Sequence, residues 1–296
     1  MLAECLEGLA IDPSGTYVDV TFGGGGHSKA ILAKLTDGHL YSFDQDADAR
    51  VQADAIDSEN FTFIQANFRS IKKYLRTFGV KRVDGILADL GISSHQIDTA
   101  ERGFSTRFDA DLDMRMDSRH GTTARQILNE YSAENLHKIL GMYGELRNAK
   151  TVAQAIVNAR SQAPLQTINQ LKSCLNSLAP RGKEHKFFAQ LFQALRIEVN
   201  EEIAVLEEFL CQVPEVLNKD GRLVVMSYHS LEDRPVKNFI RTGKLHGDVE
   251  KDFFGNEQKP LTALNRKPIE ANEAEVATNP RARSAKLRIA ICTDPS

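Results

Sequence analysis

Residues 21–32 read TFGGGGHSKAIL, four consecutive glycines followed by His27, Ser28 and a run with helical character. Glycine adopts positive φ angles and lets a ligand approach the backbone closely, so a run of this kind predicts a nucleotide-binding turn. A Walker phosphate loop would need Gly-Lys-Ser/Thr here, and a histidine follows Gly26 instead. The run is therefore not a phosphate loop of that class.

A dinucleotide fingerprint fits the run only in part, because a pattern that starts at Gly23 and Gly25 needs a third glycine where Ser28 stands. Asp44 ends the next β-rich segment about 20 residues later, where an acidic side chain can hydrogen-bond the ribose of an adenosine. NAD and S-adenosylmethionine share that ribose, but S-adenosylmethionine has no phosphate and needs only a looser turn. The methyl donor is favoured, and an NAD(P)-dependent oxidoreductase remains the alternative.

The first ninety residues alternate β-rich segments (YVDV, HLYSF, FTFIQ and VDGILADL) with helical ones. This alternation predicts βαβ units and a mostly parallel, Rossmann-like α/β sheet. Strand character returns near the end of the chain, in GRLVVMSYHS and AKLRIAIC. The segment from Glu250 to Pro280, rich in polar residues, is expected to be a partly mobile surface loop.

Between Ala100 and Pro214 the sequence shows helical patterns and no convincing strand. The last pattern, a long helix from about Lys186, repeats apolar residues at three- and four-residue steps as far as Leu210, which is typical of a face that packs on a core. We therefore expect a discontinuous nucleotide-binding domain with an inserted all-helical domain for substrate recognition. The predicted bounds are 1–98 with 212–296 for the first and 99–211 for the second.

Composition narrows the classes of protein. The 296 residues are 42% hydrophobic, and no apolar run approaches the roughly 18 to 20 residues that span a bilayer. The N-terminus is too short and acidic for a signal peptide, so a cytoplasmic protein without membrane contact is expected. Four scattered cysteines fit neither a disulfide framework nor a zinc site. A net charge of -3 excludes coating of nucleic acid by overall charge, although local basic patches remain compatible.

Two further strand ends are candidates for the same site. Asp89 ends the apolar run ILADL at the carboxyl edge of the predicted sheet, where open α/β sheets bind ligands. A carboxylate in so apolar a run is costly without a polar partner. Phe68 follows the third β-rich segment and could contact an adenine ring, with core packing as the alternative.

Several strings together resemble the bacterial 16S ribosomal RNA cytosine-N4 methyltransferases: DVTFGGGGHS, SFDQD, DGILADLGISSHQID, ERGFS, DLDMRMD, FQALRIEVNEE, GRLVVMSYHSLEDR and NPRARSAKLR. The resemblance covers nearly the whole chain in the right order. It implies a class I methyltransferase fold and methyl transfer from S-adenosylmethionine to the amine of a cytosine in the decoding region of 16S rRNA, within the small subunit. A homodimer is compatible with it. The family's donor-binding residues carry over onto Gly25, Gly26, His27, Asp44, Phe68, Asp89 and Gln96.

The residues alone do not single out His27 or Gln96, since a capping histidine and a solvent-exposed glutamine explain them equally well. Two departures stand out. Members commonly carry a His-x-Pro-Val segment before the first helix, which is absent upstream of MLAECLEGL. His95 occupies a position where the family usually has proline, so the loop before Gln96 is expected to be less rigid.

No catalytic residue is assigned from the sequence. Cytosine's amine is a poor nucleophile, so the enzyme must align it and accept its hydrogen bonds, which makes Asp89 a candidate. Tyr228 and His229, at the end of the fifth β-rich segment, are candidates for contact with the base. Ser230 and Asp233 are expected to form a capping box instead.

Basic residues concentrate in two segments and suggest phosphate contacts, with solvated faces as the alternative. DLDMRMD, which mixes both signs of charge, is expected to fold into a loop that positions an arginine. A catalytically inactive RNA-binding assembly factor would explain these clusters alone, but the acidic strand ends argue against it. The clusters comprise Arg102, Arg107, Arg115 and Arg119, and then Arg281, Arg283, Lys286 and Arg288.

Overall fold

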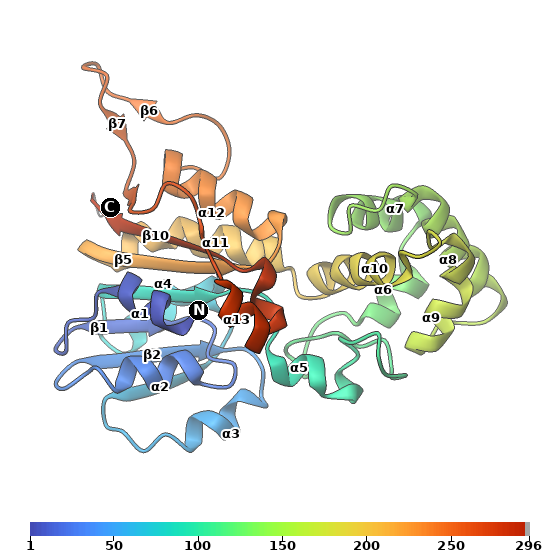
Figure 1. Ribbon diagram of the computed structural model, residues 1–296, viewed down its shortest axis with the longest axis horizontal. Coiled ribbons are helices and arrows are strands. Elements are labelled where there is room, and N and C mark those ends of the chain that lie inside the picture. The colour runs from blue at the N-terminus through green and yellow to red at the C-terminus, as the bar shows by residue number, and fades with distance from the viewer. Residues whose placement is uncertain (294–296) are drawn as a thin grey trace. The chain divides into compact units, whose positions relative to one another are not determined.

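The computed structural model describes residues 1–293 and divides into two compact units. The first unit consists of Met1–Gly91 together with the chain from Ile203 onward, and the second of Ile92–Glu202. Figure 1 labels most of the elements of both. Within the described residues, no helix is both long enough and apolar enough to cross a membrane.

The first unit contains a sheet in the order β3-β2-β1-β4-β5-β10-β8, with β9 also paired to β10. Strands β3, β2, β1, β4 and β5 are parallel, whereas β10 is antiparallel to its neighbours. This arrangement confirms the predicted Rossmann-like sheet, and the strand order reverses beside β1. The strands are β1 (Thr16–Asp19), β2 (His39–Asp44), β3 (Phe61–Gln65), β4 (Val83–Asp89), β5 (Leu217–Ser227), β8 (Leu261–Ala263), β9 (Ile269–Glu270) and β10 (Lys286–Cys292).

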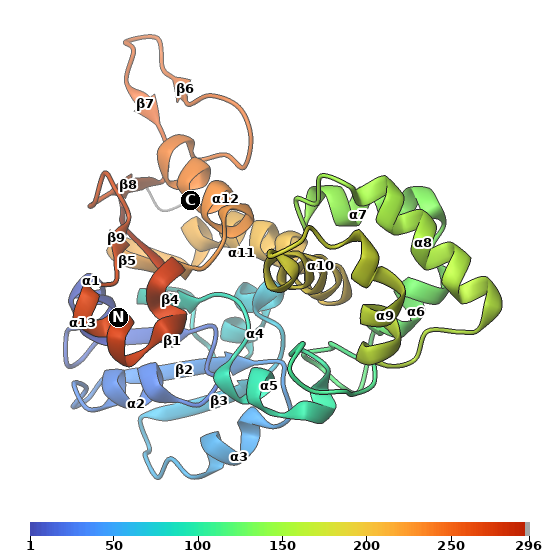
Figure 2. The ribbon, with the colours of Figure 1, turned by 45° about the vertical axis from the view of Figure 1, so that its right-hand side comes forward.

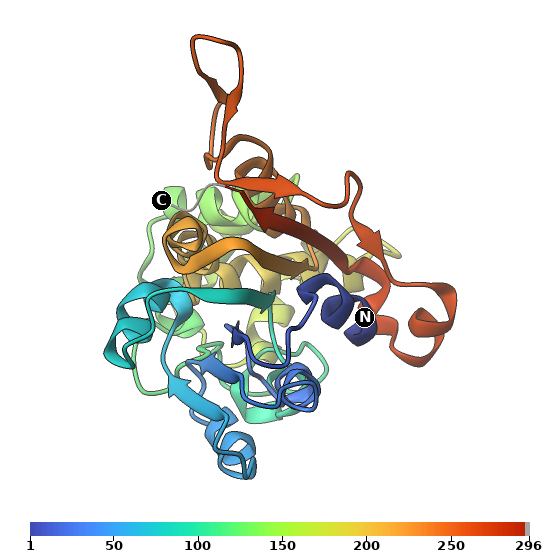
Figure 3. The ribbon, with the colours of Figure 1, turned by 90° about the vertical axis from the view of Figure 1, so that its left-hand side faces the viewer.

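Helices cover both faces of this sheet, because successive strand residues point to opposite sides. Leu87 and Val224 pack with α1 and α2, whereas Ile86 and Val225 pack with α4, α11 and α12. Figure 3 shows the blue α1 and α2 on one side and the cyan α4 and orange α11 on the other. The helices are α1 (Leu2–Leu9), α2 (Gly26–Leu32), α3 (Ala49–Asp54), α4 (Ile71–Thr77), α11 (Glu202–Val216), α12 (Ser230–Thr242) and α13 (Glu273–Thr278), with 3-10 turns η1 (Phe68–Ser70) and η4 (Pro280–Ser284).

The segment expected to be a partly mobile surface loop contains regular secondary structure. It contains the short hairpin β6 (Glu250–Lys251) and β7 (Glu257–Gln258), then β8, β9 and α13. Asp252 stabilises the hairpin turn by accepting the amides of Phe254 and Asn256 at 2.9 and 2.8 Å. Figure 2 shows this hairpin extending away from the sheet. The sequence did not predict these elements, because polar composition does not reveal such side-chain-to-backbone bonds or pairing at a sheet edge.

The second unit is helical, as expected, and its described residues hold only one isolated β-bridge, between Asp111 and Thr167. Capping boxes at Thr123 and Thr167 begin two of its helices. Apolar faces of α6 to α10 form its core. The helices are α5 (Ser94–Asp98), α6 (Ala124–Glu130), α7 (Ala133–Met142), α8 (Ala149–Gln162), α9 (Ile168–Leu175) and α10 (Glu184–Val199), with 3-10 turns η2 (Ala100–Arg102) and η3 (Asn176–Leu178).

The long helix predicted from Lys186 to Leu210 is interrupted, which corrects that expectation. Helix α10 ends at Val199, Glu201 has a left-handed φ of 50°, and α11 begins at the next residue. The Asn200 amide donates to the carbonyl of Arg196 at 2.9 Å, which closes the last turn of α10. The apolar spacing continues across the break, and therefore the periodicity alone could not locate it.

Candidate ligand-binding site at the carboxyl edge of the sheet

Three neighbouring parallel strands of the first unit end in aspartates. Asp19 ends β1, Asp44 ends β2 and Asp89 ends β4. Because β1 lies between β2 and β4, the three carboxylates belong to one edge of the sheet, at the point where the strand order reverses. Ligands of open α/β sheets bind in this position. Asp44 and Asp89 were predicted from the sequence, whereas Asp19 was missed.

Asp19 is fully buried and anchors the turn that follows β1. Its carboxylate accepts the Ser28 hydroxyl at 2.7 Å and the Thr21 amide at 3.1 Å, and Ser28 also bonds Ser42 at 2.8 Å. Desolvation raises the pKa of Asp19, although the charge of His27 and these hydrogen bonds oppose the shift. Ser28 therefore occupies the third fingerprint position as a partner for a buried carboxylate. An acid within the short strand TYVD was the signal available in the sequence.

The glycine run forms a turn whose residues have different roles. Gly23 and Gly25 have φ angles of 53° and 77°, which side chains rarely adopt. A Cβ at Gly25 would also lie 2.8 Å from the Phe22 ring. A Cβ at Gly24 or Gly26, in contrast, would meet no atom within 4 Å. The turn itself thus requires Gly25, while the backbone at Gly24 and Gly26 is accessible to a ligand.

Asp44 braces this turn and still has capacity to bind a ligand. Its two carboxylate oxygens accept the amides of Gly23 at 2.7 Å and Asp46 at 2.8 Å. Burial raises the pKa of Asp44 to about 6, against the opposing effect of these two bonds. A carboxylate can accept about four hydrogen bonds, so lone pairs remain for hydroxyl donors. Stabilisation of the turn and a ligand-binding role are therefore compatible for Asp44.

Asp89 brings three predicted site residues together. Its Oδ1 accepts the Tyr228 hydroxyl at 2.9 Å, and its Oδ2 lies 3.7 Å from His27 Nδ1. Its own amide donates to Thr21 Oγ1 at 2.7 Å. Burial raises the pKa of Asp89 to about 6, while His27 and Tyr228 act in the opposite direction. His27 Nε2 is buried and has no hydrogen-bond partner among the described residues, so the imidazole can still donate to or accept from a ligand.

Helix α12 begins with a capping box, but its residues are His229 and Glu232 and not the predicted Ser230 and Asp233. Glu232, and not Asp233, reaches back to the start of α12, where it accepts the Tyr228 amide at 2.8 Å and lies 2.9 Å from His229 Nε2. Asp233 instead forms a two-bond ion pair with Arg288 at 2.6 and 2.9 Å. Arg288 is only 8% exposed, so it is not one of the predicted phosphate contacts.

Phe68 and Gln96 have structural contacts that the sequence left undecided. The Phe68 ring packs edge-on against Phe209 with centroids 5.3 Å apart, which shows that it contributes to the core of the first unit. Gln96 lies in the second unit, where its side chain accepts the Ser93 amide at 3.0 Å in a capping box at the start of α5. Their contacts with a donor stay predictions.

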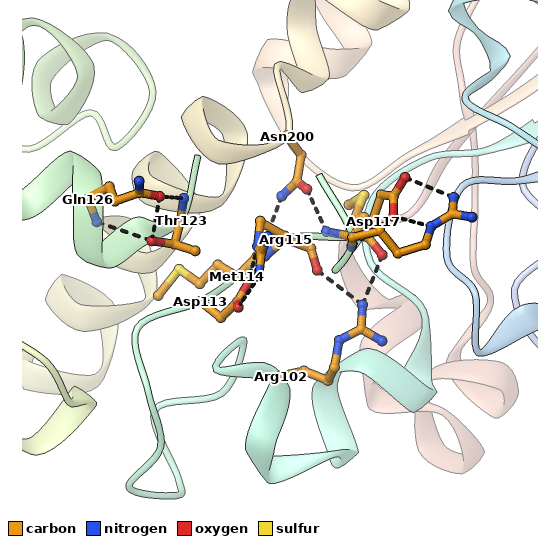
Figure 4. A network of polar contacts seen from close by, with 10 residues as sticks. Arg102, Asp113, Met114, Arg115, Asp117, Thr123, Gln126 and Asn200 are labelled. Atoms are coloured by element: carbon orange, nitrogen blue, oxygen red, sulfur yellow. Dashed lines mark hydrogen bonds and ion pairs between the residues drawn. The ribbon is translucent and has the colours of Figure 1, made fainter. Parts of the chain in front are cut away.

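The DLDMRMD segment of the second unit folds into a loop that satisfies its own charges, as Figure 4 shows. Arg115 makes two bonds of 2.8 Å to Asp113, and the next acidic residue, Asp117, pairs with Arg119. The side-chain oxygen of Asn200 accepts the Met116 amide at 2.7 Å, and its side-chain nitrogen donates to the Met114 carbonyl. The predicted folded loop is confirmed, but its arginines are bound internally rather than arrayed as unpaired phosphate contacts.

Arg102 also stabilises this loop. Its Nη2 donates to the carbonyls of Arg115 and Met116 at 3.0 and 2.9 Å, so that this guanidinium clamps the loop backbone (Figure 4). Arg107 pairs with Asp98 at 2.9 Å on the surface. The spacing of arginines in the sequence could not reveal that each has a partner within its own unit.

Comparison with known proteins gives one family across both units. Residues 1–292 match a family described as the MraW methylase family. The chain is 59% identical over 290 residues to a protein of Cytophaga hutchinsonii, covering 98% of this chain and 97% of that one, and 55% identical to one of Flavobacterium psychrophilum, covering 98% and 99%. Both relatives are named ribosomal RNA small subunit methyltransferase H. Among solved structures, an rRNA methylase from Streptococcus thermophilus aligns with a TM-score of 0.41 and 13% identity, covering 99% of this chain and 94% of that one.

Proposed function

The chain belongs to the MraW methylase family, and from this premise we propose that it transfers a methyl group from S-adenosylmethionine to the N4 amine of a cytosine in the decoding region of 16S rRNA. The observation that carries the proposal is the 59% identity to a ribosomal RNA small subunit methyltransferase H, which extends over 98% of the chain. It includes the edge of the sheet where the three aspartates end their strands.

The residues at that edge fit a methyl donor of this kind. Asp44 can accept the hydroxyls of the donor's ribose, because its oxygens keep lone pairs after bonding Gly23 and Asp46. The accessible backbone at Gly24 and Gly26 leaves room for the methionine end of the donor. The unpartnered Nε2 of His27 supplies a further polar contact there.

Charge favours this donor over a nicotinamide dinucleotide. Three carboxylates lie at this edge of the sheet, one buried (Asp19) and two partly buried (Asp44 and Asp89), and the charge of Asp19 raises the pKa of the other two. A pyrophosphate would add two negative charges beside them, which is electrostatically unfavourable at low dielectric. S-adenosylmethionine supplies an activated methyl group on a positively charged sulfonium, which such a site attracts.

Asp89 is the residue that we assign to the target amine. Its carboxylate can accept a hydrogen bond from the cytosine amine as positive charge develops on that nitrogen, and can then take up the proton. Tyr228 orients it by donating to Oδ1, which leaves Oδ2 available on the side of His27. A pKa of about 6 leaves Asp89 largely ionised at neutral pH, the state in which it accepts a proton.

The test is transfer of a labelled methyl group to small ribosomal subunits and to naked 16S rRNA, both from cells that lack the modification. We expect incorporation at one cytosine, mapped to N4 by nuclease digestion and mass spectrometry. Calorimetric titrations with S-adenosylmethionine and with NAD accompany the assay. Donor binding without incorporation into either RNA would favour an inactive assembly factor, and binding of NAD alone would favour an oxidoreductase.

A further inference from the structure

A basic segment of the first unit runs from Arg69, just after Phe68, to the amino end of β4, and none of its residues is among the candidate donor contacts. Residues 69–82, RSIKKYLRTFGVKR, contain six lysines and arginines and no acidic residue, in a chain with a net charge of -3. They form η1, α4 and the turn into β4. We propose that Lys73, Arg76 and Lys81 of this segment, which we call the amino-edge surface, bind phosphate groups of the RNA substrate. This inference rests on the proposed rRNA function.

Two cations of the segment have structural partners and are not part of the surface. Arg69 makes a two-bond ion pair with Glu208 at 2.8 and 2.6 Å, and Lys72 pairs with Glu215. Both acids lie on α11, so these pairs attach α4 to its neighbouring helix. Packing of α4 therefore explains the positive charge at these two positions.

Arg82 also has partners within the protein, and its positive charge adds to that of the neighbouring exposed cations. Its Nη1 donates to the carbonyls of Pro214 and Leu217 at 3.1 and 2.6 Å, where α11 ends and β5 begins. Carbonyls at a helix C-terminus attract a cation. These two bonds fix the guanidinium in place at the amino end of β4.

The side chains of Lys73, Arg76 and Lys81 differ from these three. All are exposed, and none makes a hydrogen bond or ion pair with another described residue. Interaction of Arg76 with the C-terminus of α4 would account for that residue alone, because Lys81 lies beyond the helix. These three cations are therefore available to contact phosphates, although the protein as a whole has a net negative charge.

The turn after α4 places three cations, Arg76, Lys81 and Arg82, around a cavity that Lys73 does not line. Gly79, at a φ of 75°, donates to the Arg76 carbonyl at 3.0 Å and reverses the chain, so that Lys81 and Arg82 return beside Arg76. These residues and Glu215 line a surface cavity of about 390 Å³. The carboxylate in this lining, Glu215, is paired with Lys72. The cavity therefore presents mainly positive charge and is large enough for a phosphodiester group.

The arrangement suits a nucleic-acid backbone better than a single small anion. Lys73 and Arg76 are three residues apart on α4 and lie on the same side of the helix, whereas Lys81 follows the turn, so the positive charge extends over both the helix and the turn. Phe78, 48% exposed, lies between Arg76 and Lys81 in the sequence, and its ring packs against Tyr41 with centroids 5.6 Å apart, so an unpaired base can contact only the exposed part of the ring. Exposed cations spread over a helix and the turn that follows it match the repeated phosphates of a nucleic-acid backbone.

The position of the surface predicts what it contributes to the reaction. Strand β4 runs from Val83, next to the surface, to Asp89, and its seven residues span about 20 Å at 3.3 Å per residue. The surface therefore cannot contact the base that reacts at Asp89. It binds another part of the RNA, which adds affinity for the substrate without changing the methyl-transfer step.

The test compares two triple variants with the same change in charge. Lys73→Ala, Arg76→Ala and Lys81→Ala remove the surface, while Lys34→Ala, Lys251→Ala and Lys267→Ala remove exposed lysines elsewhere in the same unit. RNA affinity is measured across a range of salt, with methyl-transfer kinetics and S-adenosylmethionine affinity on the same preparations. We expect the first variant to lose about two to three units of the log-log salt slope and to raise KM for RNA about ten- to a hundredfold. Its kcat and donor affinity stay at wild-type values.

Other outcomes overturn the inference. A variant that matches the lysine control in salt slope and KM would show that the surface does not bind RNA. Competition by millimolar inorganic phosphate, equal in strength to competition by RNA, would indicate a site for a free anion instead. If the wild-type chain transfers no methyl group to RNA, the proposed function itself fails, whereas wild-type transfer with no defect in the variant contradicts the surface alone.

Discussion

The aspartates at the carboxyl edge of the sheet and those of the 111–117 loop have different kinds of partner for their negative charge. Asp19 is buried and Asp44 partly buried beside backbone amides and hydroxyls, and neither has a lysine or arginine partner among the described residues. Asp113 and Asp117 each bind the arginine two residues further along the chain. A buried carboxylate without a cation is costly, so the first group remains poised for a ligand, while the second is complete without one.

The pKa values of the two groups shift in opposite directions. Burial raises the pKa of Asp44 to about 6, and the same cause raises that of Asp89. Desolvation also acts on Asp113, but the hydrogen bonds and charge of Arg115 outweigh it and lower its pKa. The Arg119 side chain lowers the pKa of Asp117. The first region is thus arranged for binding and the second for folding, and three experiments can break or sharpen this distinction.

Removal of the Asn200 side chain should have the largest effect, and only on the folding of the helical unit. In Asn200→Ala the Met116 amide and the Met114 carbonyl lose bonds of 2.7 and 2.8 Å. Two backbone groups without partners cost about 2–4 kcal/mol of unfolding free energy. Chemical denaturation and amide hydrogen exchange in the loop measure it.

Donor affinity serves as the control for this variant, because none of the proposed donor contacts of the first unit involves Asn200. Faster exchange in 111–117 with unchanged S-adenosylmethionine binding is the expected pattern. A stability loss below about 0.5 kcal/mol, the level of ordinary surface substitutions, would show that the loop does not depend on Asn200.

The sequence could identify the sheet and two of its acidic strand ends, because buried parallel strands read as apolar runs and an aspartate at the end of such a run is conspicuous. Asp19 also ends a parallel strand, but that strand has only four residues and the glycine run follows shortly after it, so the sequence indicated a turn there. Its bond with Ser28 depends on two segments meeting in space. No local pattern contains that information.

The helical unit was predictable in class but not in detail. The apolar period located its helices, yet it continues past Asn200, where a side-chain amide bonds backbone groups far away in the sequence and the helix ends. The choice of Glu232 over Asp233 at α12 has the same origin, since Asp233 pairs with a strand 55 residues away. Long-range partners decide between local alternatives of similar energy.

A substitution at Asp44 should have the next largest effect, on donor binding. Asp44→Ala removes the acceptor for the ribose hydroxyls, which should weaken S-adenosylmethionine binding by about 1–3 kcal/mol, or roughly 5- to 150-fold. Calorimetric titration measures the change. The matched control is Asp113→Ala, which removes a carboxylate of the second unit and should lower its stability with donor affinity intact. Equal affinity in the Asp44 variant and the wild type would remove Asp44 from the site.

The smallest effect, a response to pH, should have opposite signs in the two regions. Asp44 and Asp89 have folded-state pKa values of about 6 and ordinary values of 3.8, so the folded protein binds more protons than the unfolded chain between these values. These groups therefore lower the free energy of unfolding as pH rises from about 4 to 6. Donor binding needs the ionised carboxylates, and the affinity for the donor should rise about tenfold from pH 5 to 7 for one such group.

The lowered pKa values of Asp113 and Asp117 have the opposite effect on the free energy of unfolding. The stabilisation by these two groups is present above pH 3.8 and is lost as pH falls through their folded-state pKa values. Calorimetry and denaturation from pH 3 to 8 measure both responses. Asp44→Asn should flatten the rise in affinity, and an unchanged pH profile in that variant would assign the titration to Asp89 alone.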